Sequence, residues 1–94
     1  MQNERAIKKS LSPKQAILFV RLKHGRPMDI PGLFAQLWPG EALRFPTLRD
    51  KQQRLGPVVS GLNKVLRRHD LKVVTGKERG TYQLARIREI VIIK

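Results

Sequence analysis

The chain has 94 residues and a formal net charge of +13 at pH 7, from 20 Lys and Arg against seven Asp and Glu. This length fits a single domain with one modest core, and an apolar content of 40% is typical of a globular rather than a disordered chain. The absence of cysteine excludes disulfides, thiolate metal sites and cysteine nucleophiles, no apolar run is long enough to cross a membrane, and the strong positive charge predicts a polyanionic partner.

The first clear helix signal lies near the N-terminus. Ser12 is a good N-cap, Pro13 suits the first helical position, and Gln15 has the spacing of a capping box with Ser12. Gly25 supplies the left-handed residue that commonly ends such a helix. The sequence therefore predicts a helix between these residues, and the preceding residues 1–11 are expected to be an arm in which Ala6 to Leu11 supplies at most one strand.

A second helix is predicted from the N-cap Asp29 to Trp38. Its apolar positions have the i, i+3, i+4 and i+7 spacing of a buried helical stripe, and they are Ile30, Leu33, Phe34 and Leu37. Pro39-Gly40 ends this helix, and a loop containing a further proline then extends to Thr47.

A third helical region follows this loop. Thr47 and Asp50 have the spacing of another cap, which predicts a helix over residues 48–55. Because proline lacks a backbone N–H, Gly56-Pro57 is expected to interrupt or kink the helix. A further helix is then predicted over residues 57–69, with Asp70 at its end.

The remaining chain is typical of strands. The β-prone runs 71–75 and 81–84 flank a charged link, residues 76–80, with glycine at both ends, which predicts a β-hairpin. Residues 87–93 are also β-prone. They are expected either to form a third strand that pairs with the N-terminal arm or to form an exposed edge that pairs with a second chain.

The helix predicted over residues 57–69 has an apolar and a polar face when its positions are placed at about 100° per residue. No acidic residue interrupts the polar face, which consists of Ser60, Asn63, Lys64 and Arg67, flanked by Arg68. Asn binds adenine edges, and Arg or Lys binds guanine or phosphate, so this face suits the DNA major groove. The alternative is a solvated amphipathic helix whose outer face is basic.

A short helix, a helix with a basic face and a basic hairpin follow one another in the order of a winged helix-turn-helix. In that arrangement Lys77 and Arg79, at the hairpin tip, reach phosphates or the minor groove; the alternative for both is a turn kept soluble by its charge. We therefore predict an α+β fold over residues 1–94 as a single domain. It comprises a helical part over residues 12–70, with three to four helices in all, and a wing with a small antiparallel sheet over residues 71–94.

Four segments can be compared with one family of DNA-binding domains. LSPKQ, from Leu11, is similar to the opening L-T-P-K-E, and LFAQLW, from Leu33, to the second-helix segment L-L-E-x-V-W. VVSGLNKVLRR, from Val58, is similar to the recognition-helix motif V-D-V-H-I-S-R-L-R-K-K-L, and VVTGKERGTYQL, from Val73, to the wing motif I-x-T-V-R-G-x-G-Y-R-L. Residues 11–85 thus resemble the OmpR/PhoB-type winged-helix domain of transcriptional regulators.

This resemblance implies roles for individual residues. Base or phosphate contacts fall on Ser60, Asn63, Lys64 and Arg67, and wing contacts on Thr75, Lys77 and Arg79. The chain departs from the family because it has no receiver domain, too short an N-terminal region for a four-stranded sheet, and a longer link over residues 39–56. In the family the corresponding loop meets the transcription machinery or a neighbouring subunit, so the transcription machinery is an expected partner of this link.

These observations predict a sequence-specific double-stranded DNA-binding protein, a transcriptional regulator that binds DNA as a monomer, as a homodimer or in tandem. We expect it in the cytoplasm, associated with the nucleoid, because the N-terminus lacks the apolar segment of a signal peptide. The alternative is a winged-helix module for protein–protein interaction in a phage, replication or mobile-element assembly.

Other functions are less favoured by the sequence. RNA binding usually needs aromatic stacking surfaces, and the five aromatic residues here lie mostly at core-like positions. The acidic residues are scattered singly, and His24 and His69 are far apart. No catalytic site, cofactor or metal is therefore expected.

Overall fold

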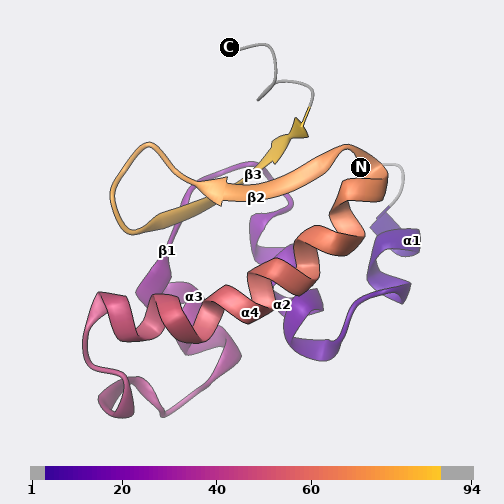
Figure 1. The fold of residues 1–94 in the computed structure, drawn as a ribbon. Coiled ribbons are helices and arrows are strands. Elements are labelled where there is room, and N and C mark those ends of the chain that lie inside the picture. Colours follow the sequence, from indigo (N-terminus) through magenta and orange to yellow (C-terminus); the bar gives the residue numbers. More distant parts are fainter. Residues whose placement is uncertain (1–3, 88–94) are drawn as a thin grey trace.

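The computed structural model describes residues 4–87. The helices are α1 (Glu4–Lys9), α2 (Pro13–Leu22), α3 (Ile30–Leu37) and α4 (Leu48–Leu66), and the strands are β1 (Met28–Asp29), β2 (Leu71–Thr75) and β3 (Thr81–Arg86). Two short 3₁₀ turns, η1 (Ala42–Arg44) and η2 (Arg67–His69), precede and follow α4. The predicted α+β class, with helices and a small antiparallel sheet, is confirmed (Figure 1).

The sheet has the strand order β1-β3-β2 and is antiparallel throughout. β2 and β3 form the predicted hairpin, with Val73 opposite Leu84. β1 was not predicted, because it lies directly before the second helix and includes its N-cap Asp29, and it pairs Met28 with Tyr82. The predicted strand over residues 87–93 lies almost entirely outside the described residues. Figure 1 shows the hairpin running alongside α4, with its tip at the end where α4 begins.

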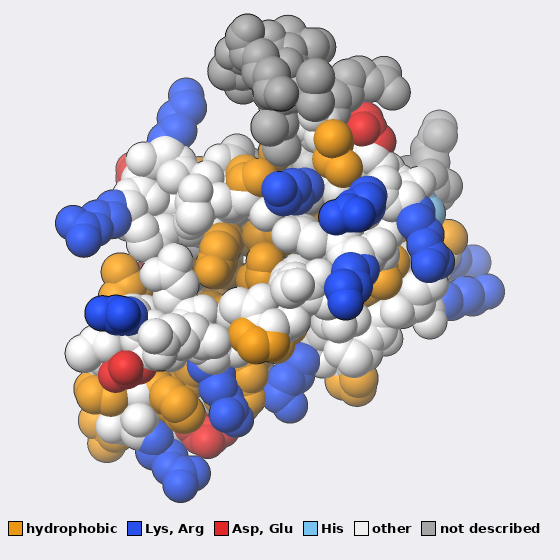
Figure 2. Space-filling view, viewed as in Figure 1, with side chains coloured by type: hydrophobic (Ala, Val, Ile, Leu, Met, Phe, Trp, Pro, Cys, Tyr) orange, Lys and Arg blue, Asp and Glu red, His pale blue; other side chains and the backbone are white. Residues whose placement is uncertain are grey.

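The core lies between the helices and the sheet, and α4 contacts α2, α3 and β2. The largest fully buried side chains come from all four helices, and they are Ile7, Leu18, Phe19, Leu22, Ile30, Leu33, Phe34, Leu55, Leu62 and Leu66. Lys and Arg side chains project from the surface around this core (Figure 2). Among the described helices, none combines the length and the apolar character that a membrane span requires.

The predicted caps at Ser12 and Thr47 are confirmed by the structure, whereas Asp29 precedes α3 without a side-chain capping hydrogen bond. The Ser12 hydroxyl accepts a hydrogen bond from the backbone N–H of Gln15 at 3.4 Å, and the Gln15 side chain accepts one from the Ser12 N–H at 3.1 Å. Thr47 and Asp50 form the same reciprocal pair at 3.0 and 3.4 Å at the start of α4. Gly25 has a φ of +76°, in the left-handed region that favours glycine.

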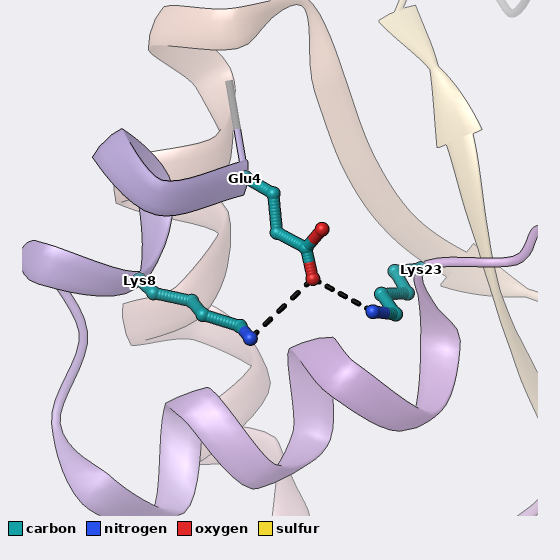
Figure 3. A network of polar contacts seen from close by, with 3 residues as sticks. All are labelled: Glu4, Lys8 and Lys23. Atoms are coloured by element: carbon teal, nitrogen blue, oxygen red, sulfur yellow. Dashed lines mark hydrogen bonds and ion pairs between the residues drawn. The ribbon is translucent and has the colours of Figure 1, made fainter. Parts of the chain in front are cut away.

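The expectation that the N-terminal arm supplies a strand is wrong, because Glu4–Lys9 forms helix α1. Glu4 makes an i, i+4 ion pair with Lys8 at 3.4 Å and a shorter one with Lys23, just after α2, at 2.7 Å (Figure 3). Ile7 is fully buried in the core. The buried Ile7 side chain and the ion pair between Glu4 and Lys23 therefore hold α1 against the rest of the domain. Both contacts involve residues far from α1 in the sequence, so the pattern of this short segment could not predict them.

Of the two alternatives expected at Gly56-Pro57, the interruption is wrong, because α4 runs without a break through 19 residues, and the kink stays a prediction. Pro57 is exposed, so its ring points to solvent and water can satisfy the Gln53 carbonyl that lacks an N–H partner. Gly56 has no Cβ to collide with the following proline ring. Buried Leu55 and Leu62 hold the helix to the core on both sides of the proline. The predicted end is confirmed at Asp70, which has a φ of 61°.

Candidate nucleic-acid interface

One side of α4 and η2 forms a continuous polar and basic strip that faces solvent. Its exposed residues are spaced by three or four positions, apart from the adjacent final pair, and they are Arg49, Gln53, Pro57, Ser60, Lys64, Arg67 and Arg68. We call this set the α4 stripe. The sequence from Lys51 to His69 contains no Asp or Glu, so nothing on that part of the stripe neutralises its cations.

Four of the predicted helix contacts, Ser60, Lys64, Arg67 and Arg68, lie on the α4 stripe. Asn63 does not lie with them. It is half-buried at the sheet side of the helix, where its Nδ2 donates to the Val73 carbonyl at 3.3 Å and its Oδ1 accepts from the Val73 N–H at 2.8 Å. The Asn63 amide is therefore occupied at both ends by β2, and this geometry gives no support to base recognition by Asn63.

The hairpin tip presents the predicted wing contacts on a defined turn. Lys77 and Arg79 are exposed on either side of Glu78. The Thr81 hydroxyl donates to the Glu78 carbonyl at 2.7 Å, and Gly80 adopts a φ of +80°. The turn is thus held by a hydrogen bond within itself, and it displays its two cations to solvent.

A groove of about 680 Å³ separates the hairpin from the beginning of α4. Arg49 and Gln52 of α4 line one side, and Thr75 and Arg79 of the hairpin line the other. The structure therefore brings two predicted wing residues together with Arg49. Arg49 was not predicted, because the helix was expected to end before the recognition segment began.

A smaller groove of about 270 Å³ lies at the other end of α4, between the helix and β2. Arg67 and Lys72 line it, and Lys72 is exposed on β2. Figure 2 shows Lys and Arg side chains gathered over the C-terminal half of α4 and at the hairpin tip. We call the α4 stripe, Lys72 and the hairpin tip together the basic face.

Four members of the basic face were not predicted as contacts, and they are Arg49, Gln53, Pro57 and Lys72. The sequence contains a signal for three of them. Arg49 and Gln53 continue the three- and four-residue spacing of Ser60 and Lys64 backwards across Pro57. Lys72 alternates with the buried Leu71 and Val73, as an outward residue of a strand does.

Two other cations of α4, Arg54 and Lys51, contact aromatic rings and backbone carbonyls within the domain instead. The Arg54 guanidinium lies 5.0 Å from the centre of the Trp38 ring and 5.2 Å from that of Phe45. The buried Lys51 ammonium donates to the Phe45 carbonyl at 2.6 Å and to the Pro46 carbonyl at 3.3 Å. The ion pairs of Lys8 and Lys23 with Glu4, and of Arg44 with Glu41, involve cations outside the basic face.

The hairpin is also attached to α4 through Tyr82. Burial raises the pKa of the Tyr82 hydroxyl, and a hydrogen bond with the Gln52 side chain acts in the opposite direction. The group is therefore protonated at neutral pH and joins β3 to the first half of α4.

Comparison of the chain with protein-family models, curated proteins and solved structures found no match. Within residues 4–87, no group of three or more His, Asp or Glu side chains is placed to hold a metal ion. The features that bear on function are thus the charge of the basic face and the two elements that display it.

Proposed function

We propose that this protein is a sequence-specific double-stranded DNA-binding protein of the winged helix-turn-helix type, and that it acts as a transcriptional regulator. The element order α2, β1, α3, α4, β2, β3 and the strand order β1-β3-β2 support this proposal. In such a fold α4 enters the major groove, α3 lies behind it, and the β2–β3 hairpin contacts the adjacent backbone or minor groove.

The observation that carries the proposal is the basic face itself. Two separate elements, α4 and the hairpin, expose cations on the two sides of one groove, with Arg49 opposite Arg79. A nucleic-acid backbone supplies an extended row of negative charges that can meet both elements at once. An acidic protein surface would more often be met by a docking helix with apolar or aromatic anchors, and the exposed positions of the α4 stripe are polar, charged or proline.

The length of the α4 stripe divides its contacts into two kinds. From Arg49 to Lys64 it extends over about 22 Å at 1.5 Å per residue, whereas the major groove is about 12 Å wide. A helix of this length therefore contacts base edges over part of the stripe and phosphates over the rest. We assign base contacts to Ser60, Lys64 and Arg67, and phosphate contacts to Lys77 and Arg79.

Selection from a randomised duplex DNA pool at about physiological salt tests this function, because purely electrostatic binding is weakened there. We expect an enriched motif. Arg67→Ala should weaken binding by roughly 1–3 kcal/mol and relax the preference at one base position. Lys77→Ala should weaken binding to all sequences alike. Lys9→Ala, on the exposed end of α1, is the charge-matched control.

A winged-helix module for protein–protein interaction is the second candidate, and Leu43 is the observation that favours it. This side chain is 93% exposed in η1, in a loop that Lys51 otherwise holds against α4. On this alternative, duplex selection yields no motif, and Leu43→Ser abolishes binding to a protein partner. An enriched DNA motif that Leu43→Ser leaves unchanged supports the first proposal.

A further inference from the structure

We infer that Asn63 is a positioning residue: its side chain fixes the β2–β3 hairpin against α4, and so sets the spacing between the cations of the hairpin tip and those of the α4 stripe. This inference rests on the proposed DNA-binding function, because the spacing matters only when both elements meet one ligand. It assigns Asn63 a role different from the base contact that the sequence predicts.

The two hydrogen bonds of Asn63 go to a single residue of the outer strand. Its amide donates to the Val73 carbonyl at 3.3 Å and accepts from the Val73 N–H at 2.8 Å. The Gly76 N–H donates to the Thr81 carbonyl of β3 at 3.0 Å. Backbone groups of successive strand residues point in alternate directions, so those of Val73 point away from β3 and toward α4. Asn63 therefore satisfies a donor and an acceptor that β3 cannot reach.

The position of Asn63 in the chain makes this contact a link between the two parts of the basic face. Its neighbour Lys64 lies on the α4 stripe, while Val73 lies four residues before Lys77. A second polar contact, between Gln52 of α4 and Tyr82 of β3, lies nearer the beginning of the helix, and α4 also packs directly against β2. The bonds of Asn63 therefore hold the second half of α4 to the outer strand, where they restrict rotation of the hairpin about its contact at Tyr82.

A fixed spacing affects binding because separate contacts must be made at the same time. When the hairpin is held in place before DNA arrives, less conformational freedom is lost on binding, and the hairpin cations contribute their full effect. When the hairpin is free to pivot, its cations contribute less to binding affinity, although their charge is unchanged. If Asn63 bound a base instead, the Val73 N–H and carbonyl would lose their hydrogen-bond partners. The free energy of those two lost bonds would make DNA binding less favourable.

The link itself is tested without DNA, by amide hydrogen exchange followed by NMR. In the wild type, we expect the Val73 amide to be protected although it lies on the outer edge of the sheet. In Asn63→Ala, its exchange should become faster by about fivefold or more, the effect of losing one hydrogen bond, while Val74 and Gln83 stay protected. If protection of Val73 is unchanged in Asn63→Ala, the inference is overturned.

The consequence for binding is tested by a double-mutant cycle on the motif selected by the wild type. Lys77→Ala should clearly raise the dissociation constant in the wild-type background. In the Asn63→Ala background, the factor by which Lys77→Ala raises it should be smaller by about threefold or more, because the two residues are coupled. Ser12→Ala serves as the background control, because it loses a helix cap in α2 without contacting the hairpin. In that background Lys77→Ala should have its wild-type effect.

Each outcome of the cycle has a separate meaning. An equal effect of Lys77→Ala in all backgrounds overturns the inference, and a relaxed preference at one base position in Asn63→Ala assigns Asn63 to base recognition instead. Failure of the wild type to bind any duplex overturns the proposed function, while the exchange experiment still decides whether Asn63 holds the hairpin. If Asn63→Ala does not fold, Asn63→Ser replaces it in both experiments, because Ser keeps a polar group at this half-buried position while its shorter side chain withdraws from the Val73 N–H and carbonyl.

Discussion

Salt should weaken duplex binding by this protein steeply, and the basic face sets how steeply. It exposes seven cations, which are Arg49, Lys64, Arg67, Arg68, Lys72, Lys77 and Arg79. Each phosphate that a cation neutralises releases counterions and contributes about −0.9 to the slope of log K against log salt concentration. With two of the seven on base edges, five phosphate contacts predict a slope of about −4.5; all seven on phosphates predict about −6.3.

The resulting loss of affinity is large enough to measure easily. Between 50 and 200 mM salt, slopes of about −4.5 and −6.3 correspond to losses of roughly 500-fold and 6,000-fold. Fluorescence anisotropy titrations of a labelled duplex at five or six salt concentrations give the slope directly. Lys77→Ala should make it shallower by about 0.9, and Lys9→Ala should leave it unchanged.

A measured slope shallower than about −2 would refute DNA binding through the whole basic face, because two phosphate contacts would then account for all the electrostatic binding. An equal change of slope in Lys9→Ala and Lys77→Ala would refute it as well. In that case, the total charge of the chain governs binding, and the arrangement of the basic face does not.

Three further predictions concern stability and can be measured by denaturant or thermal unfolding. Lys51→Met keeps the apolar stem but leaves the Phe45 and Pro46 carbonyls without their donor, so it should lower the free energy of unfolding by about 1–3 kcal/mol; no loss would show that the buried ammonium does not stabilise the loop. The hydrogen bond from Lys23 lowers the pKa of Glu4 below its usual value of 4.5, so Glu4 stabilises the fold above that pH and the contribution disappears as the pH falls below it. The difference in stability between wild type and Glu4→Gln should therefore shrink on acidification, and a difference that grows would contradict this sign. Pro57→Ala restores an N–H inside α4 and should raise stability by roughly 1–2 kcal/mol, after allowance for the freer unfolded chain; a lower melting temperature would show that the helix depends on its proline.

Elements with short-range signals could be predicted from the sequence. The capping boxes at Ser12 and Thr47 and the left-handed Gly25 depend on residues within a few positions of one another. The hairpin likewise follows from two β-prone runs around a glycine-bounded link. For these segments, the local preference and the final structure agree, so the residue pattern alone was sufficient.

The other elements depend on distant partners. α1 is docked by Lys23 and by the burial of Ile7, and β1 exists through its pairing with β3. The continuity of α4 depends on which side of the helix is buried, because Pro57 is tolerated only when its ring faces solvent.

The candidate site shows the same division between local and distant information. The three- and four-residue spacing placed Ser60, Lys64 and Arg67 together, and the structure exposes them on one side of α4. Asn63 lies at the border of that side, where the periodicity cannot distinguish a residue that faces solvent from one that faces β2. The Val73 backbone, ten residues further along the chain, decides its orientation. DNA binding by the exposed residues stays a prediction.

The contact between Asn63 and Val73 also bears on the solubility of the chain. An outer strand with free N–H and carbonyl groups is a template on which a strand of another molecule can assemble, and such assembly leads to aggregation. At Val73 both groups of β2 are already bonded within the molecule, and the exposed ammonium of Lys72 beside it repels a second copy of the same strand. The Asn63 and Lys72 side chains thus protect the outer strand of the hairpin, around Val73, from intermolecular strand pairing at high protein concentration.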